Sequence, residues 1–151
     1  MIPDDLAGMK LALAAARRAG HAGEVPVGAV LRGRDGAILA SGRNAMIARR
    51  DPTAHAEIIA IRRAGGVSVN YRLPGATLYA TLEPCLMCLG AIAHARIARV
   101  IYGATDPKRG ALAAAALPEV ARTLHHRMRW EGGLLADECG ALLRDFFLTR
   151  R

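Results

Sequence analysis

Two short stretches, Glu83–Cys88 (EPCLMC) and Thr53–Glu57 (TAHAE), decide how this sequence folds and which chemistry it can carry. Together they form an H-x-E pattern that is followed further along the chain by P-C-x-x-C. Residues three apart share one face of a helix, so Cys85 and Cys88 can bind one ion together. Each stretch is predicted to open a helix, and His55 lies at the start of its own. Two positive helix ends would then converge on one site and favour thiolate over thiol.

The residue types in these stretches predict a zinc site. One imidazole and two thiolates, from His55, Cys85 and Cys88, are typical ligands of zinc rather than of calcium or magnesium. Three protein ligands leave a fourth position for water, whereas structural zinc sites usually have four. Glu57 points elsewhere around the helix from His55, so it is a poor fourth ligand. We expect one zinc per subunit, with Glu57 as the catalytic group that takes a proton from a zinc-activated water and returns it to a leaving group.

Other roles for the same residues are weaker. A thioredoxin-like redox pair would leave the H-x-E pattern without a purpose. A non-catalytic, zinc-stabilised RNA-binding module would need a fourth protein ligand, such as His94 or Cys139. We expect Cys139 instead to be a small buried apolar residue of the last helix.

Working outward, the N-terminal half alternates between helical and strand patterns. Apolar residues recur at spacings of three and four over Asp4–Ala19, which predicts an amphipathic helix. The turn Arg34-Asp35-Gly36 separates the apolar runs Val27–Arg32 and Ala37–Ala40, which predicts a β-hairpin.

The rest of the chain continues this alternation. The further expected elements are a helix over Thr53–Ala64 closed by Gly65 and Gly66, a strand over Thr77–Leu82, a helix over Cys85–Ala95, a strand over Arg99–Gly103, a helix over Leu112–Leu124, a strand near Arg127–Trp130 and a helix over Leu135–Leu148. This order predicts an α/β fold, a three-layer α/β/α sandwich around a mixed five-stranded sheet. We expect residues 1–151 to form a single zinc-dependent domain.

Composition excludes several classes of protein. The chain has 151 residues, of which 52% are hydrophobic and 23% charged, so it is not a disordered chain. It contains no apolar run long enough to span a membrane, and Met1–Lys10 does not have the order of a signal peptide. The chain has three cysteines, which is an odd number, and two of them have C-x-x-C spacing. This pattern favours metal or redox chemistry over a disulfide framework. We therefore expect a cytoplasmic protein with no membrane partner.

The net charge leaves two interpretations open. A formal charge of +8 suggests a polyanionic partner, most simply a nucleic acid. The arginine-rich and alanine-rich composition is the signature of a GC-rich genome, in which arginine replaces lysine without functional meaning, and on charge alone this second interpretation is the stronger one. Only 4% of the residues are aromatic, which leaves little material for stacking on bases.

The H-x-E and P-C-x-x-C patterns are those of zinc nucleobase deaminases, and the sequence resembles the bacterial tRNA adenosine deaminases over nearly its whole length. The matching stretches are Glu24–Val30, Asp51–Ile58, Asn70–Leu73, Ala76–Tyr79, Thr81–Cys85, Gly133–Cys139 and Asp145–Phe147 with the terminal arginines. The resemblance implies a cytidine deaminase-like fold and a homodimer. It also implies that the substrate is the wobble adenosine of a tRNA anticodon stem-loop, which becomes inosine.

The resemblance also implies roles for individual residues. Asn44 would hydrogen-bond the flipped nucleotide, while Val27 and the backbone of Ala56 would line the base. Asp106 would lie beside the ribose of the neighbouring nucleotide. Without the resemblance, Asn44 and Asp106 read as turn residues and Val27 as an ordinary core residue.

RNA contacts are expected from four basic residues at the edge of the site and on the C-terminal tail, namely Lys108, Arg109, Arg150 and Arg151. The family usually continues after this loop with small polar residues and an Asn-His pair. This chain has the apolar Leu112–Leu117 and then His125-His126, which could contact phosphate or lie on the surface. A zinc-dependent deaminase of a free nucleobase or nucleoside (guanine, cytosine or adenosine) is therefore an alternative.

Overall fold

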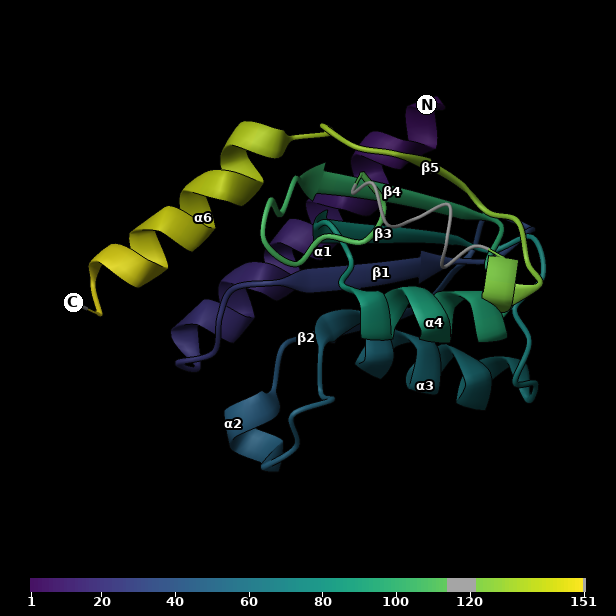
Figure 1. The fold of residues 1–151 in the computed structure, drawn as a ribbon, viewed down its shortest axis with the longest axis horizontal. Coiled ribbons are helices and arrows are strands. Elements are labelled where there is room, and N and C mark those ends of the chain that lie inside the picture. The colour runs from purple at the N-terminus through teal and green to yellow at the C-terminus, as the bar shows by residue number, and fades with distance from the viewer. Residues whose placement is uncertain (114–121, 151) are drawn as a thin grey trace.

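The computed structural model describes residues 1–113 and 122–150, which are arranged around a sheet of five strands in the order β2-β1-β3-β4-β5. The strands are β1 (Gly28–Arg32), β2 (Ile38–Arg43), β3 (Thr77–Leu82), β4 (Arg99–Ala104) and β5 (Arg129–Glu131), and the helices are α1 (Pro3–His21), α2 (Met46–Arg49), α3 (Ala56–Ser68), α4 (Leu86–His94) and α6 (Ala136–Leu148) (Figure 1). β1 runs antiparallel to β2 and β3, whereas β3, β4 and β5 are parallel. The prediction of a mixed five-stranded sheet is confirmed.

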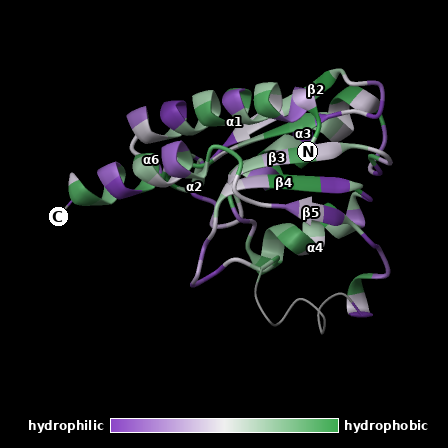
Figure 2. Ribbon diagram, turned by 90° about the horizontal axis from the view of Figure 1, so that it is seen from above, coloured by the Kyte–Doolittle hydropathy of each residue, from purple (hydrophilic) through white to green (hydrophobic). Residues whose placement is uncertain are grey.

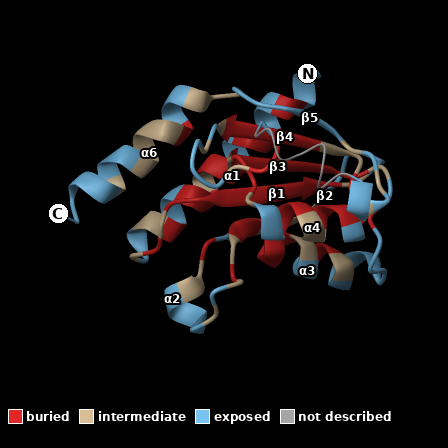
Figure 3. Cartoon of the chain, in the orientation of Figure 1, coloured by how far each residue is buried: buried red, intermediate tan, exposed pale blue. Residues whose placement is uncertain are grey.

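Helices cover both faces of this sheet. α1 and α6 lie on one side of β3, β4 and β5, and α4 lies on the other (Figure 2). Side chains alternate accordingly along each strand. Val30 and Tyr79 pack in the cluster under α1, while their neighbours Leu31 and Leu78 pack in the cluster under α3 and α4. The strands at the centre are therefore buried on both faces (Figure 3), as the predicted α/β/α sandwich requires.

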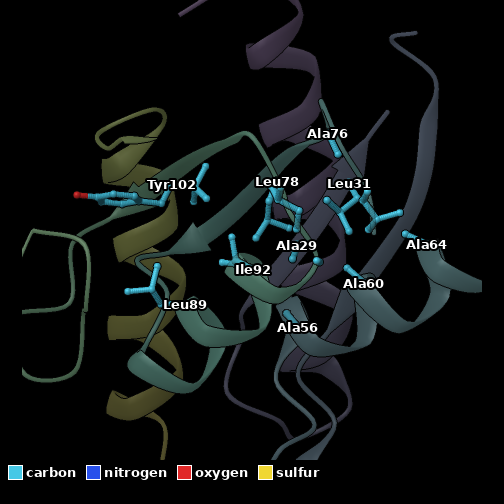
Figure 4. Close-up of a cluster of buried hydrophobic side chains, with 14 of the residues drawn as sticks. Ala29, Leu31, Ala56, Ala60, Ala64, Ala76, Leu78, Leu89, Ile92 and Tyr102 are labelled. Carbon is cyan, nitrogen blue, oxygen red and sulfur yellow. The ribbon is translucent and has the colours of Figure 1, made fainter. Parts of the chain in front are cut away.

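The layer between α3 and the sheet is built from small residues. Ala56, Ala60 and Ala64 recur every four residues along α3 and are fully buried against β1 and its neighbours (Figure 4). A Cβ atom at Gly42 of β2 would collide with the carbonyl oxygen of Ala56. The backbone of α3 thus lies directly on β2, which fixes the height of the helix above the sheet.

The predicted ends of this helix were wrong. α3 begins at Ala56 rather than Thr53, and it continues through Gly65 and Gly66 to Ser68. A glycine inside a helix costs only about 1 kcal/mol, which the packing of the preceding alanine face offsets. The helix ends where Val69 adopts the left-handed conformation with φ 51° and donates its N–H to the carbonyl of Gly65.

Two further segments differ from expectation. α2 is a single turn that the sequence pattern did not predict. The predicted helix over Leu112–Leu124 lies largely outside the described residues. Within the described part, residues 122–124 are helical, as predicted. Leu112 and Ala113 are not helical, because both of their amides are hydrogen-bonded to the Glu83 carboxylate instead.

A buried polar network ties α1 to the amino ends of β3 and β4. Asp5 is 1% exposed and accepts hydrogen bonds from the Tyr79 hydroxyl (2.7 Å), the Ile2 amide (2.8 Å) and the Arg99 guanidinium (2.8 Å). Arg32 in turn donates to the Tyr79 oxygen. No helix in the described part of the chain is both long and apolar enough to cross a bilayer.

Candidate metal and catalytic site

Two helices begin next to each other at the end of the molecule where β3 finishes. His55 is the N-cap residue of α3, and Cys85 is the N-cap residue of α4, which follows β3 after a three-residue link. Cys88 lies in the first turn of α4 and is fully buried. This is the convergence of two positive helix ends that the sequence predicted.

The three side chains form a cluster with the dimensions of a zinc site. Their ligand atoms all lie within 4.8 Å of one another. His55 Nδ1 is 3.7 Å from Cys85 Sγ and 3.6 Å from Cys88 Sγ. Tetrahedral zinc with ordinary Zn–S and Zn–N lengths would separate sulfur and nitrogen by about 3.6 Å. The residues present therefore fit the ion.

The three side chains of the cluster strongly influence one another's protonation. A hydrogen bond from the Cys88 thiol, against the opposing effect of burial and with help from His55, lowers the pKa of Cys85 to about 3. The pKa of Cys88 is raised, because its thiol donates to Cys85 and is buried. The pKa of His55 is raised chiefly by its hydrogen bond with Cys85, while the charge of Arg109 opposes that rise.

Glu57 lies in the first turn of α3, two residues after His55. Its side chain is buried, and it is not among the three residues whose ligand atoms converge. Burial raises the pKa of its carboxyl group, against hydrogen bonds that include one from Cys88. The carboxyl group is thus held beside the ligands by α3, in an environment where it can take up and release a proton.

Asn44 connects the end of β2 to the start of α3. It is 6% exposed, its Oδ1 accepts a hydrogen bond from the Ala56 amide (2.9 Å), and its Nδ2 donates to the Val25 carbonyl (3.2 Å). Val27 is also buried and belongs to the same apolar cluster as Ala56. The structure thus brings Asn44 and Ala56 into direct contact next to His55.

Asp106 caps a turn in the loop after β4. Its Oδ1 accepts hydrogen bonds from the amides of Lys108 and Arg109, both at 3.1 Å, and both of those side chains are exposed. Arg150 follows α6 and stacks its guanidinium 3.8 Å from the ring centroid of Phe146. Arg151 lies outside the described residues.

The remaining candidate ligands lie away from the cluster. His94 is exposed at the far end of α4, and Cys139 is buried on the opposite face of the sheet, in the cluster under α1. Cys139 is thus a buried residue of the last helix, as expected. His126 forms a 2.7 Å hydrogen bond with the Ile97 carbonyl, while His125 is exposed.

Two buried glutamates escaped prediction. Glu24 is 2% exposed and accepts hydrogen bonds from the amides of Ile47 and Ala48, at the start of α2. Glu83 is 3% exposed and binds three amides of the loop after β4. In the sequence, each appears only as an acidic residue next to an apolar strand. That pattern does not indicate which backbone amides the carboxylate binds.

Comparisons with known proteins agree with this geometry. The family described as cytidine and deoxycytidylate deaminase zinc-binding region matches residues 3–104. The tRNA-specific adenosine deaminase of Haemophilus influenzae is 46% identical over 143 residues, which cover 95% of this chain and 83% of that protein.

Two solved structures are also similar. One, from work on A-to-I editing by tRNA:A34 deaminases at the wobble position of transfer RNA, superposes with a TM-score of 0.87 at 47% identity, covering 91% of this chain and 99% of that one. A guanine deaminase from Nitrosomonas europaea has a TM-score of 0.81 at 25% identity, covering 96% of this chain and 84% of that one.

Proposed function

We propose that this chain converts adenosine to inosine at the wobble position of tRNA. It belongs to the cytidine and deoxycytidylate deaminase zinc-binding family and, within that family, to the tRNA-specific adenosine deaminases. The observation that carries the proposal is the likeness to the Haemophilus influenzae enzyme, which extends over 95% of the chain. The three candidate ligands lie within residues 3–104, which match the zinc-binding family. The guanine deaminase shares the fold at a much lower identity of 25%, so a free purine base is the weaker candidate substrate.

The chemistry divides between the ion and the chain. When bound by His55, Cys85 and Cys88, zinc supplies a Lewis acid that makes water nucleophilic near neutral pH. Glu57 moves the protons: its buried carboxyl group takes one from the attacking water and delivers one to the leaving amine. Its raised pKa is consistent with a group that works in both directions.

The neighbouring residues are proposed to hold the flipped base. Val27 supplies an apolar wall, and the contact between Asn44 and the Ala56 amide fixes the polar edge of the pocket. Asn44 uses Oδ1 and one Nδ2 hydrogen within the chain, which leaves its second Nδ2 hydrogen for the nucleotide. Asp106 is proposed to lie beside the ribose of the adjacent nucleotide, although its Oδ1 also caps its own turn.

RNA binding and assembly are further parts of the proposal. Lys108, Arg109, Arg150 and Arg151 are proposed to contact RNA phosphates, which the net charge of +8 supports. A homodimer is proposed, and the exposed apolar side chains of Leu86 (57%) and Met87 (38%) beside the ligands support a partner there.

We also propose a single deaminase domain over residues 1–151 and a cytoplasmic location, which suits a chain whose cysteines are all free thiols.

The substrate is tested with the zinc-loaded chain and an anticodon stem-loop that carries adenosine at the wobble position. A stem-loop with guanosine there is the matched control, and free adenosine, guanine and cytosine are the competing substrates. Inosine and ammonia are measured. We expect the adenosine stem-loop to be deaminated far faster than free adenosine, because flanking contacts orient the base. Equal or faster turnover of a free base would refute the proposal.

The four basic residues are tested through salt dependence. RNA affinity should fall with salt at a log–log slope of about −0.7 per neutralised phosphate. Replacing Lys108, Arg109, Arg150 and Arg151 together by alanine should flatten this slope and leave zinc content unchanged. An unchanged slope would remove them from the RNA-binding surface.

A further inference from the structure

Glu83 is a buried carboxylate that the proposed chemistry does not use. It follows β3 directly, lies two residues before the ligand Cys85 and is 3% exposed. Its Oε1 accepts a hydrogen bond from the Asp106 amide (3.1 Å). Its Oε2 accepts two more, from the amides of Leu112 (3.0 Å) and Ala113 (2.9 Å). All three donors are backbone amides of one loop, so this carboxylate binds the loop at its start and at its end.

The same loop is pressed against the segment that carries the metal ligand. Gly110 forms an isolated β-bridge with Cys85, and the Ala111 amide donates to the Pro84 carbonyl at 2.9 Å. A Cβ atom at Gly110 would collide with the Glu83 carboxylate. A side chain at position 110 would therefore displace the Glu83 carboxylate from the amides that it binds.

The loop presents two of the basic side chains. Between the residues that Glu83 holds, the Asp106 side chain caps the turn and leaves Lys108 and Arg109 exposed. Arg109 directly precedes Gly110, which forms a β-bridge with the ligand Cys85, so the loop carries the Arg109 charge next to the metal site. A charged hydrogen-bond acceptor with three amide donors is a strong restraint on such a loop.

We propose that Glu83 is a positioning residue, whose carboxylate holds residues 106–113 in the path that presents Lys108 and Arg109 to the RNA phosphates beside the reacting nucleotide. This inference rests on the proposed function, because it concerns how that substrate is bound. Fixing a loop before binding removes the entropy cost of ordering it on the complex. Glu83 therefore acts on substrate affinity through the loop and leaves the reacting atoms to Glu57 and the metal ligands.

The test is the Glu83→Gln variant of the zinc-loaded protein. Its amide nitrogen cannot accept a hydrogen bond, so at least one of the three loop amides loses its partner. We expect the KM for the adenosine stem-loop to rise about tenfold, with kcat and the zinc content unchanged. Hydrogen exchange at residues 106–113 should become faster. An unchanged KM together with a faster-exchanging loop would refute the inference, and so would loss of zinc.

A double substitution separates positioning from general destabilisation. If Glu83 acts through the two cations, Glu83→Gln should raise KM no further in a Lys108→Ala/Arg109→Ala background. Full additivity would contradict the proposal. The matched control is Asp5→Asn, which replaces a similarly buried carboxylate near the other end of β3. It should leave the KM for the stem-loop unchanged.

Gly110→Ala keeps the inference testable if Glu83→Gln does not fold. The added methyl group displaces the loop from the carboxylate side and should raise KM in the same way. Wild-type turnover of the stem-loop tests the proposed function, whereas the ratio of variant to wild-type KM tests the inference. A wild-type protein that deaminates only free bases would thus refute the function, and a ratio of one would refute the role of Glu83.

Discussion

β3 has a polar cluster at each of its ends, and the two clusters are built for different purposes. At the amino end, Asp5 is surrounded by donors from Tyr79, Arg99 and the Ile2 amide, so its charge is balanced within the chain. At the carboxyl end, His55, Cys85 and Cys88 converge mainly on one another. Sulfur and nitrogen atoms gathered in this way are stabilised by a cation. The amino-end cluster is thus complete within the chain, whereas the carboxyl-end cluster is a set of ligands that fits an added cation.

Of the changes that distinguish the two clusters, removal of a metal ligand should have the largest effect on zinc content, activity and stability. Cys88→Ser should lose zinc, lose activity and unfold at a lower temperature, because metal binding contributes to folding. An ion present at a thousand times its Kd adds about 4 kcal/mol to stability. Elemental analysis and thermal denaturation measure both effects.

The matched control is Cys139→Ser, a buried cysteine on the other face of the sheet. It should lower the melting temperature and keep one zinc per chain. Retention of zinc by Cys88→Ser would show that the cluster at the carboxyl end is not the metal site.

The second prediction separates chemistry from structure within the carboxyl-end cluster. Glu57→Gln should keep its zinc and its fold but lose about 10²–10⁴ in kcat, the usual contribution of a positioned acid–base group. Single-turnover deamination and metal analysis check this. Release of zinc by this variant would instead make Glu57 a ligand, against the geometry described above.

The third prediction concerns the amino-end cluster. Asp5→Asn removes the charge that Arg99 and Tyr79 share, and it should lower the free energy of unfolding by about 1.5–3 kcal/mol. Zinc content and kcat/KM should not change, because the cluster lies at the opposite end of β3. Urea denaturation gives the stability, and a loss of activity in the folded variant would show that the two ends are coupled.

The smallest effect is a pH dependence of stability. Burial opposes ionisation of Asp5, but hydrogen bonds from Arg99, Ile2 and Tyr79 outweigh it, so its pKa lies below the ordinary value of 3.8. A lowered folded-state pKa contributes stability above pH 3.8 that is lost as the pH falls through the folded value. The difference in melting temperature between wild type and Asp5→Asn should therefore shrink as the pH falls below about 4. A constant difference would contradict this assignment.

The sequence predicted the metal end of the molecule better than the loops around it. Cys85 and Cys88 are close in sequence and lie at one helix start, so spacing alone indicated their geometry. The hairpin at Asp35-Gly36 was likewise encoded in a local pattern and is confirmed by the pairing of β1 with β2. Local patterns are reliable where the interacting residues are also neighbours in the chain.

Long-range hydrogen bonds explain what the sequence did not predict. Glu24 stabilises α2 from 23 residues away, and Glu83 reaches Ala113 across 30 residues. No periodicity encodes such partners. The same limit applies to the end of α3, where packing of Ala64 outweighs the helix-breaking tendency of Gly65 and Gly66.

The contact between Gly42 and the Ala56 carbonyl also governs how this sequence can diverge. A side chain at position 42 would push α3 outward and carry His55 and Glu57 away from the cysteines on α4. A substitution in the core at this position would therefore alter catalysis. The loops are not subject to this constraint, and one of them carries Lys108 and Arg109, the proposed RNA contacts. Selectivity can therefore evolve while the reaction stays the same.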